Sequence, residues 1–267
     1  MKLGNRLQVM FAVLFLLVCC NLAVLNTQMY RAENNLDMHS LIQDARTMTD
    51  QRSVAALYDY LAPTSIMIDR VMPSVVQITI NTGLFHPITG EEGIIYGTGM
   101  VISKDGNILT CNHLMDRLSN KKASGVVKLS NGRIYKIKKF VGDDFNDLAV
   151  AKIEPNEPLM PVELNEPKTV KLGDEVWAIG NPFDLGLSVS NGAVSRIYDY
   201  VQYTGSIQIN ASLNPGNSGC PVFDRLGKVV GVAVSLRSGA QGGISFVIGM
   251  DKVSEVLPGL LSRLNEQ

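Results

Sequence analysis

Apolar and polar positions divide the chain into three stretches with different patterns. Residues 7–25 are almost continuously apolar, interrupted only by Gln8 and Asn21, and the basic residues Lys2 and Arg6 precede them. Nineteen helical residues span about 28 Å, close to the thickness of a bilayer's hydrocarbon core. We therefore expect residues 1–30 to form a single transmembrane signal-anchor helix. The alternative is a removed signal peptide, but no convincing small-x-small cleavage site follows the apolar run.

The basic start of this helix predicts its orientation. Because positive residues stay on the cytoplasmic side, the rest of the chain is expected on the extracytoplasmic, periplasmic or extracellular side, as a single-pass membrane-anchored protein. Residues 31–62 are polar, with apolar positions at roughly helical spacing, and we expect a partly helical stem. A plain tether is the alternative.

From Val71 the pattern changes to short apolar and β-branched runs separated by glycine and asparagine. A hairpin is predicted over residues 126–140, with both Asn131 and Gly132 at positive φ in the turn. The chain ends in a predicted helix over residues 250–264, despite Pro258. We expect one all-β domain, residues 63–267, built as a sandwich or as barrels. The runs that read as strands are residues 75–80, 99–103, 108–110, 148–153, 176–180, 206–209, 221–223, 229–235 and 244–249.

Composition and motifs exclude several classes of function. The net charge is −1, so nothing favours nucleic acid as a partner. Four cysteines and three histidines without a CxxC spacing argue against a zinc site, so we expect no metal. The phosphate loop, GxGxxG and HExxH motifs are absent, and no cofactor is expected.

Nucleophilic catalysis is the chemistry that the remaining candidates favour. Ser218 lies in the glycine-rich segment NASLNPGNSGCPVFD, residues 210–224. A nucleophilic serine needs a base within hydrogen-bond reach and a group that orients the base. His113 follows a predicted strand directly, whereas His39 lies in the stem and His86 in a loop. Asp147 lies at the start of the predicted strand LAVAKI and is the candidate group that orients the base.

The glycines around Ser218 suggest an oxyanion hole. Acyl transfer places negative charge on the substrate carbonyl oxygen, which two converging backbone N–H groups can stabilise by several kcal/mol. Side chains obstruct a loop that must aim successive N–H groups at one point. The N–H groups of Gly216 and Ser218 are the predicted donors. Alternatively, GNSG is a turn with a bystander serine.

Five segments, in order, resemble the HtrA/Deg branch of the trypsin-like serine proteases. His113, Asp147 and Ser218 occur in the order of chymotrypsin-type enzymes, and the resemblance covers about residues 71–257. The segments that carry it are GTGMVISKDGNILTCNHLM (97–115), FNDLAVAKI (145–153), AIGNPFDLGLSVSNGAVSRI (178–197), IQINASLNPGNSG (207–219) and GGISFVIGMDKV (242–253).

The resemblance implies a fold and an activity. The fold is a chymotrypsin-like double six-stranded β-barrel with a C-terminal helix. Ser218 would attack the peptide carbonyl, His113 would carry its proton to the leaving amine, and Asp147 would orient the imidazole. The implied function is protein quality control, hydrolysis of unfolded or damaged proteins. A homotrimer is a further implication, whereas the PDZ modules usual in HtrA proteins have no counterpart before Gln267. The alternative is a proteolytically weak chaperone or scaffold that binds exposed apolar segments.

Two positions, 217 and 220, depart from the family pattern. Cys220 replaces a glycine, and we expect it to pack against Cys111, either as a disulfide or as two buried free thiols. Asn217 replaces the aspartate of digestive relatives, which pairs with a newly cut N-terminal amine. An amide cannot form that ion pair, so activation by cleavage is not required.

Specificity is predicted from the pocket positions. Ser212, six residues before the nucleophile, occupies the position where trypsin-type pockets carry an acid. The segment VAVSL, residues 232–236, is expected to supply the opposite wall through Val232 and Val234. We therefore expect cleavage after small or medium apolar residues.

Overall fold

The computed structural model of the chain describes residues 63–85, 91–167, 169–198, 207–234 and 244–267. The chain divides into two compact units, residues 1–67 and 68–267. The predicted anchor and stem, together with His39 and His86, lie outside the described residues. Within the part that the structure describes, no helix has the length and apolar character needed to cross a membrane.

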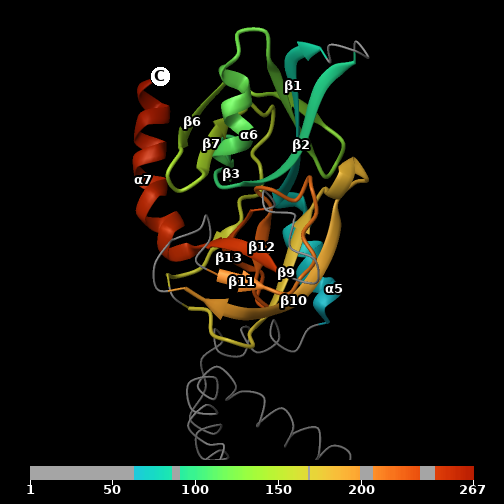
Figure 1. Ribbon diagram of the computed structural model, residues 1–267, viewed down its shortest axis with the longest axis vertical. Helices are drawn as coiled ribbons and strands as arrows, with labels where there is room; N and C mark the ends of the chain where they lie inside the picture. Colours follow the sequence, from blue (N-terminus) through green and yellow to red (C-terminus); the bar gives the residue numbers. More distant parts are fainter. Residues whose placement is uncertain (1–62, 86–90, 168, 199–206, 235–243) are drawn as a thin grey trace, which may run out of the picture. The chain divides into compact units, whose positions relative to one another are not determined.

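A seven-stranded antiparallel sheet forms the first half of the larger unit (Figure 1). Its strands are β1 (Val75–Phe85), β2 (Glu92–Val101), β3 (Asn107–Cys111), β4 (Ser124–Leu129), β5 (Ile134–Lys136), β6 (Lys139–Asp143) and β7 (Leu148–Lys152). Their spatial order is β5-β4-β1-β2-β3-β7-β6. Val76, Ile78 and Ile80 alternate along β1 and are fully buried, which is the period-two pattern of a strand with one face on a core.

The first sheet differs from the predicted six-stranded barrel. It has seven strands, and among the described residues no pairing joins its edge strands β5 and β6. The chain itself crosses between the edges: Ile137 donates to the Gly125 carbonyl of β4, and Lys138 to the Lys152 carbonyl of β7. Among the described residues β5 pairs with β4 alone, so this sheet is a half-barrel.

The second sheet closes. Its strands are β8 (Glu163–Leu164), β9 (Glu175–Gly180), β10 (Ser188–Ile197), β11 (Ile207–Ile209), β12 (Pro221–Phe223), β13 (Lys228–Val234) and β14 (Ser245–Gly249). The order is β12-β9-β10-β11-β14-β13-β8, and β12 also pairs with β13. That extra pairing closes six antiparallel strands into a barrel, with β8 attached in parallel at its side. A six-stranded barrel is therefore confirmed for the second sheet only.

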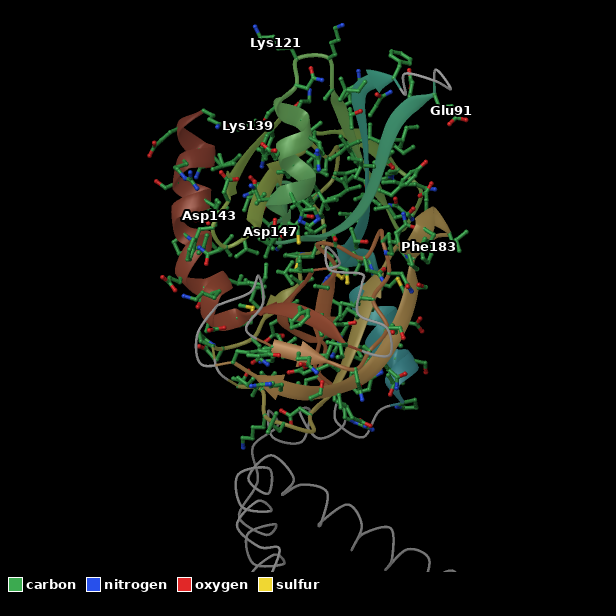
Figure 2. All side chains as sticks on the ribbon, in the orientation of Figure 1. Glu91, Lys121, Lys139, Asp143, Asp147 and Phe183 are labelled. Carbon is green, nitrogen blue, oxygen red and sulfur yellow. The ribbon has the colours of Figure 1, made fainter. Side chains whose placement is uncertain are left out.

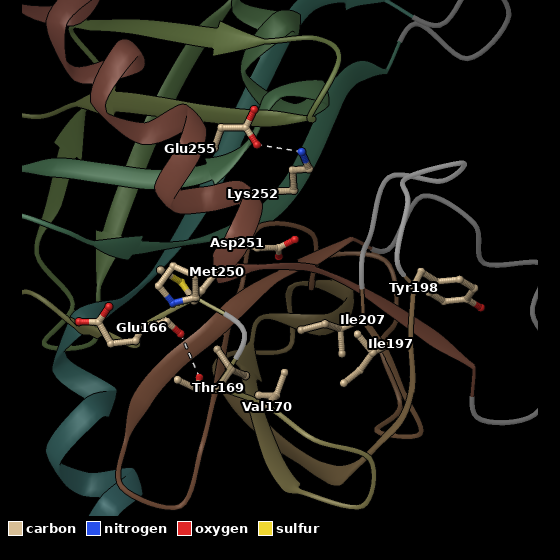
Figure 3. A pocket seen from close by; sticks show the side chains of 12 residues that line it. Glu166, Thr169, Val170, Ile197, Tyr198, Ile207, Met250, Asp251, Lys252 and Glu255 are labelled. Carbon is tan, nitrogen blue, oxygen red and sulfur yellow. Dashed lines mark hydrogen bonds and ion pairs between the residues drawn. The ribbon is translucent and has the colours of Figure 1, made fainter.

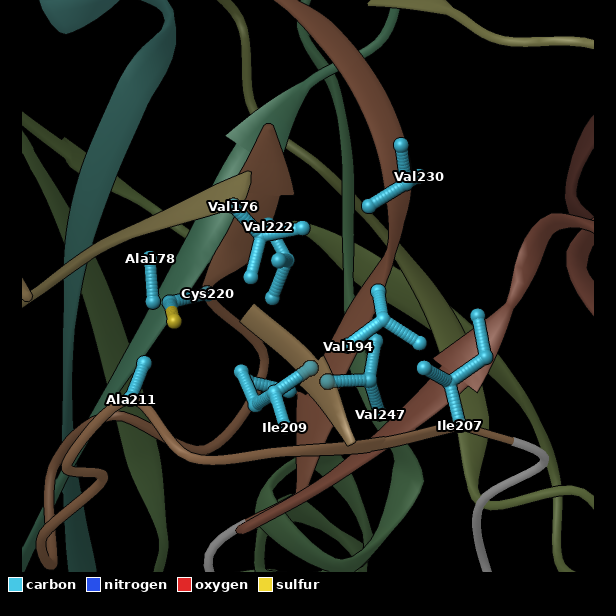
Figure 4. Close-up of a cluster of buried hydrophobic side chains, with 11 residues drawn as sticks. Val176, Ala178, Val194, Ile207, Ile209, Ala211, Cys220, Val222, Val230 and Val247 are labelled. Atoms are coloured by element: carbon cyan, nitrogen blue, oxygen red, sulfur yellow. The ribbon is translucent and has the colours of Figure 1, made fainter. Parts of the chain in front are cut away.

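Small apolar side chains fill the second barrel (Figure 4). Cys220 is one of them and lies beside Ala178 and Ala211. A Cβ on Gly180 would lie 3.1 Å from the Cβ of Cys220, so a glycine at that position gives the cysteine its space.

The predicted hairpin forms, but its turn differs from the expected type. Only Gly132, at φ 85°, has positive φ, whereas Asn131 does not. The Asn131 side chain instead accepts a hydrogen bond from the Arg133 N–H at 3.0 Å, while Gly132 donates to Leu129. This is a longer turn with a single left-handed glycine, which requires positive φ at one residue only.

Helical segments are few in the described part. They are α5 (Thr64–Val71), α6 (Asn112–Met115) and α7 (Met250–Glu266), with 3-10 turns at Met72–Ser74, Asp116–Ser119 and Pro182–Asp184. The predicted C-terminal helix is confirmed as α7, which contacts β6 and β7 of the first sheet and β13 and β14 of the second (Figure 1). Its buried residues Val253, Leu260 and Leu264 recur at helical spacing, and Pro258 lies on the exposed side.

The packing of α7 predicts the effect of a core truncation. Leu260 is fully buried, so Leu260→Ala should lower the free energy of unfolding by about 2–5 kcal/mol. Leu261→Ala, on the half-buried side of the same turn, is the control and should cost less than half as much. Urea denaturation of the full-length chain measures both. Equal losses would show that α7 does not pack on the sheets through Leu260.

Candidate active site

Asp147 lies directly before β7 and is buried, 5% exposed. Strand β7 pairs with β3 so that Leu148 faces Cys111, which brings Asp147 beside the residues that follow β3. Its backbone has φ 53°, a left-handed conformation that aspartate tolerates better than most residues. The Asp147 carbonyl accepts the Asn112 N–H at 3.1 Å, which helps to hold this conformation. Figure 2 shows Asp147 at the end of α6 that faces the second sheet.

His113 contacts this carboxylate through both its backbone and its ring. It is the second residue of α6, and its N–H donates to Asp147 Oδ1 at 2.8 Å. Its Nδ1 lies 2.8 Å from Oδ2 and 3.0 Å from Oδ1. A carboxylate can only accept, so Nδ1 carries the proton and Nε2 is left as a base. The side chain of His113 is 21% exposed and that of Asp147 only 7%, so solvent reaches the imidazole.

The loop that carries Ser218 depends on two left-handed glycines. Gly216 has φ 100° and Gly219 has φ 83°. A Cβ on Gly219 would overlap Thr110 Oγ1 and the Thr98 carbonyl oxygen, both on the first sheet. Glycine therefore lets the backbone on either side of Ser218 lie directly against β2 and β3.

Thr98 of β2 is the centre of this contact. It is fully buried, and its N–H donates to the Ser218 carbonyl at 2.9 Å. Its hydroxyl donates to the Gly216 carbonyl at 2.7 Å and accepts the Asn181 N–H at 3.0 Å. Its carbonyl accepts the hydroxyl of Thr110 at 2.7 Å. Through its backbone and its hydroxyl, this one residue joins β2, β3, the end of β9 and the Ser218 loop.

The peptide before Gly216 has a defined orientation. The Pro215 carbonyl accepts the Phe183 N–H at 2.8 Å. In a trans peptide the C=O and the following N–H point in opposite directions, so the Gly216 N–H points away from Phe183. Within the described part of the chain, no hydrogen bond uses the Gly216 N–H. It is the donor expected of an oxyanion hole.

Asn217 lies between these glycines and is buried, 5% exposed. Its Oδ1 has no hydrogen-bond partner among the described residues. A Cβ on Gly180 would lie 2.5 Å from this oxygen, so glycine at 180 makes room for the amide.

Cys111 and Cys220 are free thiols, both fully buried. Cys111 Sγ donates to the Ala233 carbonyl at 3.4 Å, and Ala233 also pairs with Cys220 through its N–H. Burial, and after it the neighbouring Asp147 carboxylate and Cys220 thiol, raises the pKa of the Cys111 thiol well above its usual range. Burial likewise raises the pKa of Cys220. Of the two expected alternatives, the structure has the pair of buried free thiols, with no disulfide between them.

The expected specificity residues are only partly described. Ser212 is exposed, Val232 is fully buried and Val234 is 5% exposed. Residues 235 and 236 lie outside the described part, so the wall assigned to residues 232–236 stays a prediction.

A pocket of about 620 Å³ opens elsewhere, between the start of α7 and the second barrel (Figure 3). Val170, Ile207 and Met250 are among its lining residues, and His113, Asp147 and Ser218 are not. This pocket is therefore not the site described above.

Comparisons with known proteins agree with this arrangement. Residues 97–232, about half of the chain, match the family model of the trypsin-like peptidase domain, and the chain belongs to this family. A probable periplasmic serine endoprotease DegP-like of Brucella suis biovar 1 (strain 1330) is 38% identical over 179 residues, 65% of this chain and 34% of that protein. Serine endoprotease DegS of Haemophilus influenzae is 38% identical over 170 residues, 60% of this chain and 48% of that protein.

A solved structure shows the same fold. The crystal structure of the serine endoprotease from Yersinia pestis superposes with a TM-score of 0.60 at 30% identity, covering 75% of this chain and 67% of that one. The resemblance to HtrA/Deg proteases is thereby confirmed. The chain spans between a third and a half of the length of the two curated relatives.

Thr98 and Thr110 do not stand out in the sequence as residues of the site. Both lie in the segment 97–115 that carried the resemblance, and alternation along β2 and β3 indicates only that they face inward. The available signal was a threonine next to glycines in a predicted buried strand. A buried hydroxyl needs a hydrogen-bond partner, so such a threonine indicates a contact with another segment.

Gly219 offers a test of how the Ser218 loop contacts the first sheet. Gly219→Ala should lower the free energy of unfolding by at least about 2 kcal/mol more than Gly132→Ala does. Both substitutions place a side chain on a left-handed backbone, but only the one at Gly219 also forces the new Cβ against neighbouring atoms. Gly132 has a similar φ of 85° but nothing within 4 Å of the added Cβ. Urea denaturation measures the difference. Equal costs would contradict the close approach of Gly219 to Thr98 and Thr110.

Proposed function

We propose that the chain is a serine endopeptidase that uses Ser218, His113 and Asp147 as a catalytic triad. The observation that carries the proposal is the paired contact of Asp147 with the backbone N–H and Nδ1 of His113, at 2.8 Å each to the nearer oxygen. Two bonds from one carboxylate fix both the position and the tautomer of the imidazole. This is the arrangement that a general base requires.

The proposed hydrolytic cycle assigns a role to each of these residues. Nε2 of His113 accepts the proton of Ser218 as its Oγ attacks the peptide carbonyl, and the imidazolium is stabilised by Asp147. The N–H groups of Gly216 and Ser218 stabilise the oxyanion, and His113 then returns its proton to the leaving amine. Water then hydrolyses the acyl-enzyme through the same steps, with His113 again as the base. The orientation of the Pro215–Gly216 peptide supports a preformed oxyanion hole.

The biological setting is proposed from the sequence and the relatives. Residues 1–30 would anchor the enzyme in a membrane, with the peptidase domain on the extracytoplasmic side. One curated relative is named a probable periplasmic serine endoprotease DegP-like, which agrees with that location. Unfolded or damaged proteins are the proposed substrates, and a homotrimer is the proposed assembly.

Replacement of the nucleophile tests the activity. Ser218→Ala in the full-length chain should reduce casein cleavage by about a thousandfold or more, because no other group can form the acyl-enzyme. Ser254→Ala, on the exposed side of α7, should leave the rate unchanged. Matching urea midpoints of the variants establish that both fold. An undiminished rate in Ser218→Ala would refute the triad, and suppression of aggregation without any cleavage would favour the chaperone alternative.

Peptide substrates test the specificity. Position 212 carries a serine and not an acid, so the pocket should prefer apolar residues. Peptides with Val, Ala or Ile before the scissile bond should have a kcat/KM at least about tenfold above that of matched peptides with Lys or Arg there. A profile dominated by Lys and Arg would contradict the pocket assignment.

A further inference from the structure

Cys111, His113 and Asp147 form a group that the hydrolytic mechanism uses only in part. Each offers one ligand atom, a thiol sulfur, an imidazole nitrogen and a carboxylate oxygen, and these atoms lie within 4.8 Å of one another. Proton transfer engages the ring of His113 and the carboxylate of Asp147. The thiol of Cys111 has no role in it. We propose that the three side chains form an inhibitory binding site for a thiophilic divalent cation such as Zn²⁺.

The three ligand atoms suit this class of ion. Zn²⁺ is bound by cysteine sulfur, histidine nitrogen and aspartate oxygen, usually in a tetrahedron whose fourth position can hold water. Metal–ligand bonds of about 2.0–2.3 Å place tetrahedral ligand atoms about 3.3–3.6 Å apart. The present 2.8 Å between His113 Nδ1 and Asp147 Oδ2 must therefore widen by about half an ångström, and separations in the group that approach 4.8 Å must shorten by about one ångström. His113 has the more exposed side chain of that pair, so the imidazole is the group that moves.

Charge and proton balance are favourable for a buried ion. The carboxylate of Asp147 and a thiolate at Cys111 together neutralise the two charges of the cation, so no net charge is buried. Cys111 loses its proton to water, as metal-bound thiols do. The imidazole stays neutral: Nδ1 binds the metal and the ring proton moves to Nε2. One proton is released for each ion bound.

Binding of the ion would stop catalysis at its first step. A protonated Nε2 cannot accept the proton of Ser218, and a carboxylate bound to metal no longer orients the ring. This consequence rests on the proposed peptidase function, whereas binding of the ion does not.

Sequence spacing argued against zinc because the chain has no CxxC pair. The structure builds the group differently. Cys111 and His113 are two residues apart at the junction of β3 and α6, and the β3–β7 pairing adds Asp147 from 34 residues further along the chain. A search for contiguous motifs does not detect a site of this kind.

Cadmium and zinc titrations test the proposal on the full-length chain with its thiols reduced. Cd²⁺ should produce a thiolate-to-metal charge-transfer absorbance, and Zn²⁺ should inhibit peptide cleavage until a chelator restores it. Cys111→Ala should abolish the absorbance and raise the half-inhibitory Zn²⁺ concentration at least tenfold, relative to its own metal-free rate. Cys111→Ser, which keeps the volume, should do the same.

Two controls separate the possible failures. Cys220→Ala removes the other buried thiol among the described residues and should keep both effects. Ser218→Ala should lose cleavage but retain the Cd²⁺ absorbance, so a failure of the peptidase assignment is distinguished from a failure of the metal site. Absence of the absorbance in the unmodified chain, its persistence in Cys111→Ala, or unchanged zinc sensitivity of that variant would overturn the proposal.

Discussion

The attachment of the Ser218 loop to the first sheet through Thr98 is the interaction on which the site depends. The candidate nucleophile belongs to the second barrel, whereas His113 and Asp147 belong to the first sheet. Thr98 bonds the carbonyls of both Gly216 and Ser218, at 2.7 and 2.9 Å, from a fully buried position. Since unpaired buried polar groups cost about 1–3 kcal/mol each, separating the loop from β2 would be expensive. The contact therefore holds together the two halves of the candidate site, which lie far apart in sequence.

Local backbone strain accompanies this arrangement. Asp147 has a left-handed backbone, and so do Gly216 and Gly219 of the Ser218 loop. A left-handed aspartate costs on the order of 1 kcal/mol, which the hydrogen bonds to Asn112 and His113 offset. Glycine removes the corresponding cost from the Ser218 loop. The site is thus built from main-chain conformations that neighbouring hydrogen bonds stabilise.

Much of the fold and of the candidate site was predictable from the sequence. Strands such as residues 148–153 are apolar enough that pattern alone predicts them, and His113 and Asp147 stood out because each adjoins such a strand. The half-open first sheet was not predictable, because closure depends on where residues 137 and 138 cross between β4 and β7. The turn at Gly132 was assigned to the wrong type because Asn-Gly fits more than one hairpin loop. Thr98 escaped notice because its partners come from remote segments.

Covalent labelling by an organophosphonate tests the central claim most directly. Such a reagent reacts with a serine only when a base activates the hydroxyl and donors stabilise the developing oxyanion. The account predicts one adduct per chain, located by peptide mass spectrometry on the peptide that contains Ser218. An adduct on another residue, or none on the folded chain, would contradict the claim that Thr98 holds Ser218 beside a working His113–Asp147 pair.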